Sequence, residues 1–266
     1  MTQKSADLVA KELLSLTDND VEAAIRALRN AVVKKSKIRV PVNSPVVVEV
    51  KEIKKSYKTG STHVEALKGV DLQVKQGEFV ALTGTSGSGK STLLQLIGGL
   101  DKPSSGSVLI NGQDISKFSD RKLSKFRNKT IGFVFQFFYL QPFLTLATNV
   151  EVPAMFARIK PNNRHDRSVS TIDAVGLSDR ITHLPRELSG GQLQRAAIAR
   201  ALMNNPKILL ADEPTGNLDS NNAVAIFDMF EKIRSDYGTT VIVVTHDTSL
   251  ASRADRIVQL SDGVLV

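Results

Sequence analysis

A stretch of nine residues constrains the fold of this chain more than any other: Gly84-Thr85-Ser86-Gly87-Ser88-Gly89-Lys90-Ser91-Thr92. It follows the pattern G-x-x-x-x-G-K-S of a phosphate-binding loop. Residues 78–83 before it are mostly apolar and predict a buried strand, and leucines at helical spacing follow it. Its glycines let successive backbone N–H groups turn toward one anion, and the helix after it adds the positive end of its dipole. We expect Lys90 to reach the β- and γ-phosphates of a nucleotide and the Ser91 hydroxyl to hold Mg²⁺. A Gly- and Ser-rich turn that matches by chance is the alternative, and the flanking strand and helix argue against it.

Composition narrows the class of protein. The chain has 266 residues and is 41% hydrophobic, enough for one large α/β domain or two small ones. It has no cysteine, which excludes disulfides and cysteine-based metal sites and fits a reducing compartment. Tryptophan is absent and aromatics make up 5%, which argues against an aromatic-lined surface for carbohydrate or nucleic acid. The net charge of +8 is spread along the sequence, which indicates a solvated basic surface or contact with an anionic membrane face.

No membrane span or leader is expected. The sequence contains no run of about 18 apolar residues, and its N-terminus lacks the apolar core of a signal peptide. Residues 1–40 carry apolar positions at helical spacing on both sides of the turn Thr17-Asp18-Asn19-Asp20, which predicts an N-terminal helical hairpin. Such a hairpin must dock on something, either the rest of the chain or a partner, and the sequence leaves both open. Residues 41–45, with two prolines, are the predicted linker.

The remainder, residues 46–266, predicts one α/β domain. It begins with β-rich segments typical of an antiparallel sheet and continues with the strand–loop–helix unit. A mostly helical stretch covers about 137–190, and alternating strands and helices follow, which indicates a parallel sheet with helices on both faces. Ligands of such sheets bind at the carboxyl ends of the strands. The phosphate loop, Gln136, Asp212-Glu213 and His246 each follow a predicted strand, so we expect them to meet at one edge.

These residues suit phosphoryl chemistry. Asp212 can steady Mg²⁺ through a water, and Glu213 can polarise the water that attacks the γ-phosphate, a contribution of about 10²–10⁴-fold. An acidic strand end that only caps the next helix is the alternative. His246 could orient the γ-phosphate and the attacking water, although a lone histidine is more often structural. Gln136 could offer its amide oxygen to Mg²⁺, or be an ordinary polar strand end.

A second anion site is indicated at Leu188-Ser189-Gly190-Gly191-Gln192, directly before a strong buried-helix pattern. Serine and two glycines at a helix N-terminus can bind an anion, although a plain capping turn has the same composition. One bound triphosphate already has its phosphates in the first loop. A second phosphate site on the chain is therefore best explained if it binds the nucleotide of another copy. This favours a head-to-tail dimer with ATP between the copies.

Taken in order, the motifs resemble those of an ABC-transporter nucleotide-binding subunit. They are the phosphate loop at 84–91, Gln136, the signature at 188–192, Asp212 with Glu213, the segment Asn217-Leu218-Asp219, and His246. The resemblance covers about residues 47–266 and implies a P-loop NTPase cassette: an antiparallel β subdomain, a parallel core sheet and a helical subdomain. It implies ATP hydrolysis with ATP and Mg²⁺, and catalytic roles for Lys90, Gln136, Glu213 and His246. Tyr57 matches the family's adenine-stacking aromatic, a contact of about 1–3 kcal/mol, and Asp219 would face the nucleotide at the dimer interface.

A narrower resemblance lies in Ala211-Asp212-Glu213-Pro214-Thr215-Gly216-Asn217-Leu218-Asp219-Ser220 and Phe135-Gln136-Phe137-Phe138-Tyr139-Leu140. Both are similar to the bacterial cassettes of lipoprotein release, macrolide export and cell division. That resemblance implies that ATP-driven closure is transmitted to a separate transmembrane permease, which would contact about residues 137–152. The protein would then sit peripherally on the cytoplasmic face of the cell membrane. The aromatics Phe137, Phe138, Tyr139 and Phe143 suit such a contact, or else belong to the core of the helical insertion.

Two departures and two alternatives remain. Residues 1–40 are outside the family pattern, and we expect neither the C-terminal regulatory domain of sugar-importer cassettes nor a fused membrane domain. A cassette that acts mainly as an ATP-gated regulator of cell-division or cell-wall machinery is one alternative. A soluble ABC ATPase acting on DNA or ribosomes is the other. Such proteins usually carry two cassettes or a long coiled-coil insertion, whereas the stretch from Gln136 to Leu188 has only the size of an ordinary helical subdomain. We therefore expect no nucleic-acid partner.

Overall fold

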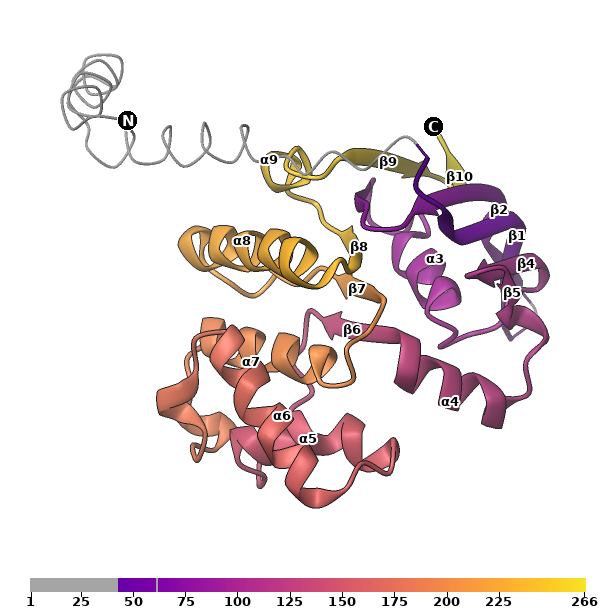
Figure 1. The fold of residues 1–266 in the computed structure, drawn as a ribbon. Coiled ribbons are helices and arrows are strands. Elements are labelled where there is room, and N and C mark those ends of the chain that lie inside the picture. Colours follow the sequence, from indigo (N-terminus) through magenta and orange to yellow (C-terminus); the bar gives the residue numbers. More distant parts are fainter. Residues whose placement is uncertain (1–42, 61) are drawn as a thin grey trace, which may run out of the picture. The chain divides into compact units, whose positions relative to one another are not determined.

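The computed structural model describes residues 43–60 and 62–266, which form two sheets with helices around them (Figure 1). The helical hairpin predicted for residues 1–40 lies outside the described residues, as do the first two residues of the predicted linker. Both expectations therefore stay predictions.

The first sheet is antiparallel, with the strand order β2-β1-β4-β5. Its two long strands, β1 (Val46–Thr59) and β2 (Thr62–Lys75), pair along their length with several register shifts. The short strands β4 (Ser105–Ile110) and β5 (Gln113–Asp114) form a hairpin. Its two turn residues, Asn111 and Gly112, both have positive φ angles of 49° and 73°, as a two-residue turn between twisted strands requires.

The second sheet has six strands in the order β10-β9-β3-β8-β7-β6. The strands are β3 (Phe79–Thr83), β6 (Ile131–Phe135), β7 (Ile208–Asp212), β8 (Thr240–Val244), β9 (Arg256–Ser261) and β10 (Val264–Leu265). All neighbours run parallel except β9 and β10. The central strands are continuous apolar runs because a parallel sheet is covered on both faces. The expected α/β fold with an antiparallel part and a parallel core is therefore confirmed.

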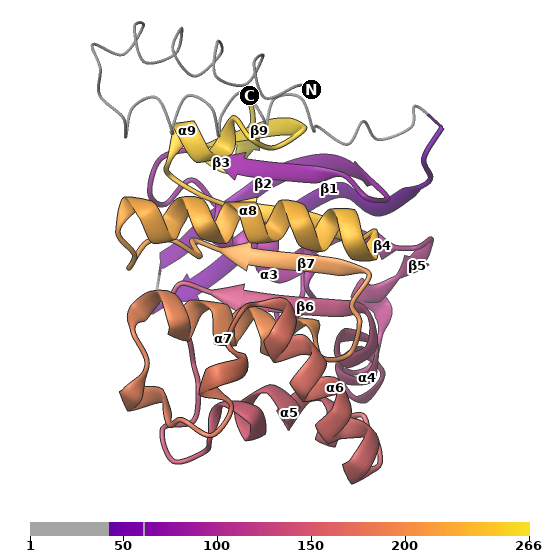
Figure 2. The same ribbon diagram turned by 60° about the vertical axis from the view of Figure 1, so that its left-hand side comes forward.

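Helices cover both faces of this sheet (Figures 1 and 2). They are α3 (Lys90–Ile97), α4 (Asp120–Thr130), α5 (Leu146–Phe156), α6 (Pro161–Ala174), α7 (Gly190–Leu202), α8 (Ser220–Tyr237) and α9 (Thr248–Ala251). Single 3₁₀ turns lie at Ile115–Lys117, Ser178–Arg180 and Pro185–Glu187. No helix of the described part is long and apolar enough to cross a bilayer.

Alternation along the central strands produces two hydrophobic cores. Val80 and Leu82 pack with α3 and the antiparallel sheet, whereas Phe79 and Ala81 pack on the opposite side with residues of α5 to α8. This follows from the two-residue period of a strand, which points successive side chains to opposite faces. The phosphate loop is thus attached to a strand that is buried from both sides.

The helices differ from expectation in two places. The sequence pattern predicts no helix at 120–130, where α4 lies, because only Leu123 and Thr130 of α4 are buried and no apolar period shows. The signals it does carry are Asp120 in its first turn and basic residues in its last turn, which suit the helix dipole. Helix α6 begins at Pro161, whereas the apolar pattern alone predicts a helix only from about Arg167; proline at the first position is the usual start signal.

Candidate active site

The glycine loop fits between two neighbouring segments. It joins β3 to α3, and Gly84, Gly87 and Gly89 have φ angles of 143°, 78° and 103°, which side chains rarely adopt. A Cβ atom at Gly84 would collide with the carbonyl oxygen of Leu260 on β9, and one at Gly89 would lie 2.5 Å from the carbonyl oxygen of Ala66 on β2. Glycine is therefore required at both ends of the loop by close packing as well as by φ.

Two polar side chains of the loop are buried. The Lys90 ammonium donates a hydrogen bond to the carbonyl oxygen of Thr85 at 2.7 Å, and Lys90 is 4% exposed. Burial lowers the pKa of Lys90, and the nearby carboxylates of Glu213 and Asp212 oppose that shift. The Ser88 hydroxyl is also buried and has no hydrogen-bond partner within the described residues. Buried polar groups are normally paired, so a loop of this construction fits a polar ligand such as a phosphate.

Ser91 and Asp212 form the second feature. The Ser91 hydroxyl donates to Oδ1 of Asp212 at 2.8 Å, although 121 residues separate them. Asp212 is the last residue of β7, where it pairs with Val244 of β8. Burial raises the pKa of Asp212, and Glu213 raises it further, while the Ser91 hydrogen bond and Lys90 oppose the shift. Hydroxyl and carboxylate oxygens are the hard donors that Mg²⁺ prefers, so the pair fits that ion.

Glu213 and His246 form the third feature. Oε1 of Glu213 lies 2.6 Å from Nε2 of His246, the second residue after the end of β8. The backbone of Glu213 has a positive φ of 46°, and its N–H donates to the carbonyl oxygen of Val244 at 3.1 Å. The chain therefore turns sharply after β7 and places the carboxylate against the imidazole rather than along the strand.

Gln136 stands beside the turn that follows Glu213. Its carbonyl oxygen accepts from Nδ2 of Asn217 at 3.1 Å, and a Cβ atom at Gly216 would come within 2.8 Å of its amide nitrogen. Strands β3, β8, β7 and β6 are neighbours in this order and parallel. The phosphate loop, His246, Asp212-Glu213 and Gln136 therefore leave the sheet at the same edge.

The segment Ser189–Gln192 lies in different surroundings. The Ser189 hydroxyl accepts from the Gln192 N–H at 3.3 Å, and Oε1 of Gln192 accepts from the Ser189 N–H at 2.8 Å. This reciprocal arrangement is a capping box, so both side chains are occupied in capping the start of α7. The N–H groups of Gly190 and Gly191 belong to the first turn of α7, where an α-helix has no internal acceptors.

A second group of residues forms around this segment. Side chains at Gly190 and Gly191 would meet Leu218 and Asn222, respectively, and Asp219 caps α8 by accepting from the Asn222 N–H at 2.9 Å. Within the described part of the chain, no hydrogen bond or ion pair joins residues 188–192 to the loop 84–92. The structure thus brings the signature together with Asp219 and not with the phosphate loop.

Tyr57 lies on β1 and is held from three directions. Its hydroxyl donates to Oδ2 of Asp101 at 3.0 Å, and the Lys55 ammonium lies 4.8 Å from the ring centre. Burial raises the pKa of Tyr57, Asp101 adds to the shift, and a hydrogen bond with Thr92 opposes it. Tyr57 is therefore fixed next to the first turn of α3. The sequence reasoning missed Lys55 and Asp101, since neither belongs to a local pattern.

Helix α7 carries two more residues that the sequence reasoning missed. The Arg200 guanidinium donates to the carbonyl oxygens of Phe138 and Tyr139 at 2.8 and 2.5 Å, and Nε2 of Gln194 donates to that of Phe135 at 3.3 Å. The segment after β6 is thus held by its backbone. The sequence does carry a signal for these two residues, since Gln194 and Arg200 are polar positions that interrupt the apolar pattern of this helix.

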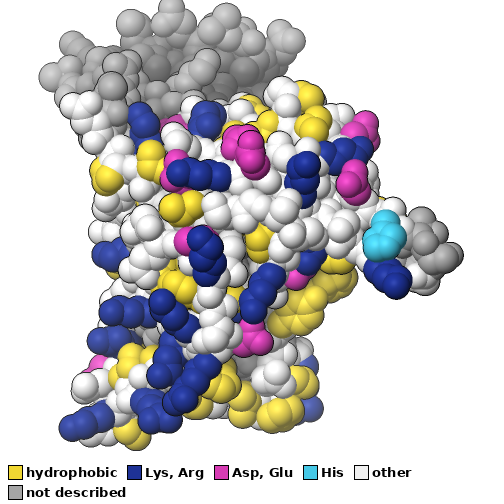
Figure 3. All heavy atoms as spheres, turned by 90° about the vertical axis from the view of Figure 1, so that its right-hand side faces the viewer, with side chains coloured by type: hydrophobic (Ala, Val, Ile, Leu, Met, Phe, Trp, Pro, Cys, Tyr) yellow, Lys and Arg dark blue, Asp and Glu magenta, His cyan; other side chains and the backbone are white. Residues whose placement is uncertain are grey.

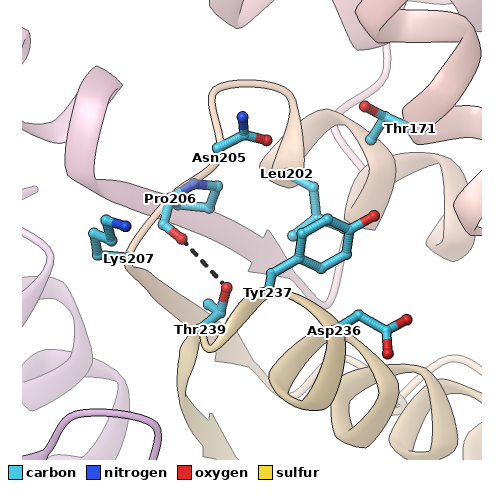
Figure 4. A pocket seen from close by; sticks show the side chains of 8 residues that line it. All are labelled: Thr171, Leu202, Asn205, Pro206, Lys207, Asp236, Tyr237 and Thr239. Atoms are coloured by element: carbon cyan, nitrogen blue, oxygen red, sulfur yellow. Dashed lines mark hydrogen bonds between the residues drawn. The ribbon is translucent and has the colours of Figure 1, made fainter.

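A cavity of about 340 Å³ is lined by none of these residues, and Figure 4 draws the side chains that line it. It is lined by Thr171, Leu202, Asn205, Pro206, Lys207, Asp236, Tyr237 and Thr239. Lys207 and Thr239 directly precede β7 and β8, so the cavity is at the amino ends of these strands, opposite the glycine loop. It is not part of the candidate site.

The chain belongs to the ABC transporter family, whose sequence pattern matches residues 67–216. Among its relatives is the ABC transporter ATP-binding protein YknY of Bacillus subtilis, with 46% identity over 83% of this chain and 95% of that protein. The lipoprotein-releasing system ATP-binding protein LolD of Geobacter metallireducens is 47% identical over 83% of this chain and 98% of its own length.

The macrolide export ATP-binding/permease protein MacB of Nitrosomonas europaea is 45% identical over 85% of this chain, which matches 34% of that longer protein. A solved dimer of the ATP-binding cassette MJ0796, bound to ADP and Pi, superposes with a TM-score of 0.77 at 45% identity, covering 82% of this chain and 96% of that one. The resemblance to the lipoprotein-release and macrolide-export branch is thereby confirmed.

Proposed function

We propose that this chain is the ATP-binding and ATP-hydrolysing subunit of a membrane complex, and that two copies close around two ATP molecules to drive a separate transmembrane partner. The observation that carries the proposal is the gathering of the glycine loop, the Ser91–Asp212 pair and the Glu213–His246 pair at one sheet edge. Relatives that are named as ATP-binding proteins of an ABC transporter and of a lipoprotein-releasing system support it.

The binding roles follow from the donors at this edge. The loop N–H groups and Lys90 would hold the phosphates of ATP, and the ring of Tyr57 would stack on the adenine. Ser91, Asp212 and Gln136 would hold Mg²⁺ through their oxygen atoms. When bound, Mg²⁺ supplies charge neutralisation at the transferred phosphoryl group.

Glu213 is the proposed base. Its carboxylate accepts a proton from a water whose oxygen forms the new bond to the γ-phosphorus, while the bond from that phosphorus to the bridging oxygen of ADP breaks. The His246 imidazole, 2.6 Å from Oε1 of Glu213, fixes the direction of the carboxylate. A base placed in this way contributes about 10²–10⁴-fold to the rate.

The dimer supplies the second half of each site. Because residues 189–192 and Asp219 group together and apart from the loop of their own chain, we propose that they face the nucleotide of the partner copy. The N–H groups of Gly190 and Gly191 would be the phosphate donors there, since the side chains of Ser189 and Gln192 cap each other. The dimeric structures of MJ0796 support this arrangement.

The membrane partner would dock on residues 137–152. In this stretch Phe137, Tyr139 and Phe143 are 61%, 64% and 74% exposed, which favours a docking role for them over a place in the core. Exposed aromatic clusters are typical anchors of protein interfaces. The chain would then be peripheral at the cytoplasmic face of the membrane.

Two substitutions test the ATPase. The Glu213→Gln protein should bind ATP, form a stable ATP-bound dimer in size-exclusion chromatography with light scattering, and turn over at least 10²-fold more slowly. The Lys90→Ala protein should lose ATP affinity and stay monomeric. Asp236→Asn, an acid at the opposite end of the strands, is the control and should keep normal turnover. Normal turnover by Glu213→Gln would sink its assignment as the base.

The partner is tested separately by affinity capture from detergent-solubilised membranes. We expect a multi-span protein to be recovered with the native chain and lost when Phe137 and Phe143 are both changed to Ser. Recovery of only soluble division or cell-wall proteins would instead support the regulatory alternative. ATP turnover of the isolated Phe137→Ser, Phe143→Ser protein should be unchanged.

A further inference from the structure

Helix α4 presents an unpaired basic face. Arg121, Lys125 and Lys129 recur every four residues, so they share one side of the helix, and all three are exposed. The buried Leu123 and Thr130 mark the opposite side. None of the three basic residues forms an ion pair with any described residue, whereas the neighbouring Asp120 is bound to Lys102 at 2.7 Å.

The end of helix α5 is fixed beside this face. Nδ2 of Asn128 donates to the carbonyl oxygen of Pro153 at 2.9 Å. Nδ2 of Asn204 donates to the carbonyl oxygens of both Asn128 and Pro153, at 3.0 and 3.1 Å. The last turns of α4 and α5 are therefore locked together by backbone contacts through two amide side chains.

Exposed apolar and basic residues follow Pro153 directly. Met155 and Phe156 are 38% and 80% exposed, and Arg158 and Lys160 come next, both exposed and without an ion pair in the part that the structure describes. The acid nearest in the chain, Glu151, is bound to Arg164 at 3.0 Å. We call the combined area the basic–apolar surface; its residues are Arg121, Lys125, Lys129, Met155, Phe156, Arg158 and Lys160.

Figure 3 shows the side of the molecule on which α4 lies. Lys and Arg side chains gather over its lower part, with hydrophobic side chains among them and few acidic ones. A solvated surface of a helix usually mixes both signs of charge, with ion pairs between them. Basic residues around a protruding phenylalanine and methionine have the composition of an interfacial membrane contact.

We propose that the basic–apolar surface binds the anionic phospholipid headgroups of a bilayer, with Phe156 and Met155 entering the interface. Basic residues near an anionic leaflet attract it additively, and the neighbouring apolar side chains gain from leaving water. Lipid is favoured over an acidic protein partner because the five basic residues are divided between α4 and the segment after α5, with exposed apolar residues beside the second group, and none of the five forms an ion pair within the described residues. This contact goes beyond the proposed function and does not depend on ATP turnover.

The surface also continues the segment proposed for the permease. Helix α5 begins within residues 137–152 and ends in the basic–apolar surface. A bilayer contact there would set the height and tilt of the cassette at the membrane while the aromatic residues engage the partner. The two contacts use different chemistry, so they can be tested independently.

The test is flotation of the full-length protein with vesicles of phosphatidylcholine alone or with about 30% phosphatidylglycerol. We expect binding only to the anionic vesicles, and loss of it in 0.5 M salt, since exposed charges are screened within a few ångströms there. The variant Arg121→Glu, Lys125→Glu, Lys129→Glu should bind at least about tenfold more weakly. Phe156→Ser should also bind several-fold more weakly at unchanged charge.

A matched control separates this surface from general basicity. Lys54, Lys68 and Lys232 are exposed, form no ion pair within the described residues and lie on β1, β2 and α8. The variant in which all three are changed to Glu alters the net charge by the same amount as the first triple variant. It should float with anionic vesicles as the native protein does. Equal loss in both triple variants, or equal binding to both kinds of vesicle, would overturn the proposal. Two results together would point to an acidic protein partner and also overturn the proposal. Polyglutamate of matched charge would displace the protein from anionic vesicles, and the Phe156→Ser protein would bind the vesicles as strongly as the native protein. Should the first triple variant melt early, Phe156→Ser and the salt series still decide.

Discussion

Arg200 is predicted to hold the segment that would receive the membrane partner. Its guanidinium donates to the carbonyl oxygens of Phe138 and Tyr139 at 2.8 and 2.5 Å, from a half-buried position on α7. Burial lowers the pKa of Arg200, but a guanidinium stays charged in proteins. Hydrogen bonds from a charged donor contribute about 1.5–3 kcal/mol each, and their removal leaves two carbonyl groups without a partner.

Arg200→Ala should therefore lower the free energy of unfolding by about 2–4 kcal/mol, once partial hydration of the two carbonyls is allowed for. For a chain of this size, that corresponds to a Tm about 5–15 °C lower. Hydrogen exchange should speed up most in the peptide that covers residues 136–144, because its backbone loses its anchor. Calorimetry and exchange mass spectrometry measure the two effects on the same sample.

Arg195 offers a control on the same helix. Its Nη1 approaches the carbonyl oxygens of Val175 and Gly176 at 3.4 Å each, which makes weak hydrogen bonds. Arg195→Ala should cost under about 1 kcal/mol and should not affect exchange at 136–144. The reasoning would be refuted if the two arginine variants melted together, or if exchange at 136–144 stayed at the native rate in Arg200→Ala.

Three further predictions concern charge and packing. Because burial raises the pKa of Asp212, its ionisation costs folding free energy at every pH above that raised value, and the cost vanishes below the unfolded-state pKa. Asp212→Asn should therefore raise the Tm of the nucleotide-free protein at pH 7, with the gain lost below about pH 4; a lower Tm at pH 7 would contradict this. Gly98→Ala would press a Cβ atom into the ring of Phe133 and should cost about 1–3 kcal/mol in urea denaturation, with partial rescue by Phe133→Leu. Asp255→Ala deprives the buried Arg234 of a carboxylate 2.8 Å away and should cost about 3–5 kcal/mol; a loss under 1 kcal/mol would show that the pair is well hydrated.

The sequence predicted the edge of the sheet well because local signals were sufficient there. The phosphate loop needs glycine at fixed places. Short apolar runs predict strands that end at or just before Asp212 and His246. Parallel strands share an edge at their carboxyl ends, so the pattern predicts that the residues after these strands lie together. The same logic predicted that these residues would gather, although it could not supply the 2.6 Å contact between Glu213 and His246.

Contacts between distant residues were beyond sequence reasoning. Tyr57 is anchored by Asp101, 44 positions away, and the backbone of Phe138 by Arg200, 62 positions away. Such pairs depend on how two elements pack, and no period or motif encodes them in a single sequence. Helix α4 was missed for a related reason, since its face is mostly polar and its boundaries rely on charge at the termini.

The backbone at Glu213 has a consequence for laboratory evolution. A φ of 46° favours glycine or asparagine, and a glutamate held there stores about 1 kcal/mol or more of strain. A library of variants selected for heat resistance alone should therefore enrich glycine or asparagine at position 213. A library selected for ATP-dependent growth should keep the glutamate. The ratio of the two enrichments would measure how strongly the organism needs that carboxylate.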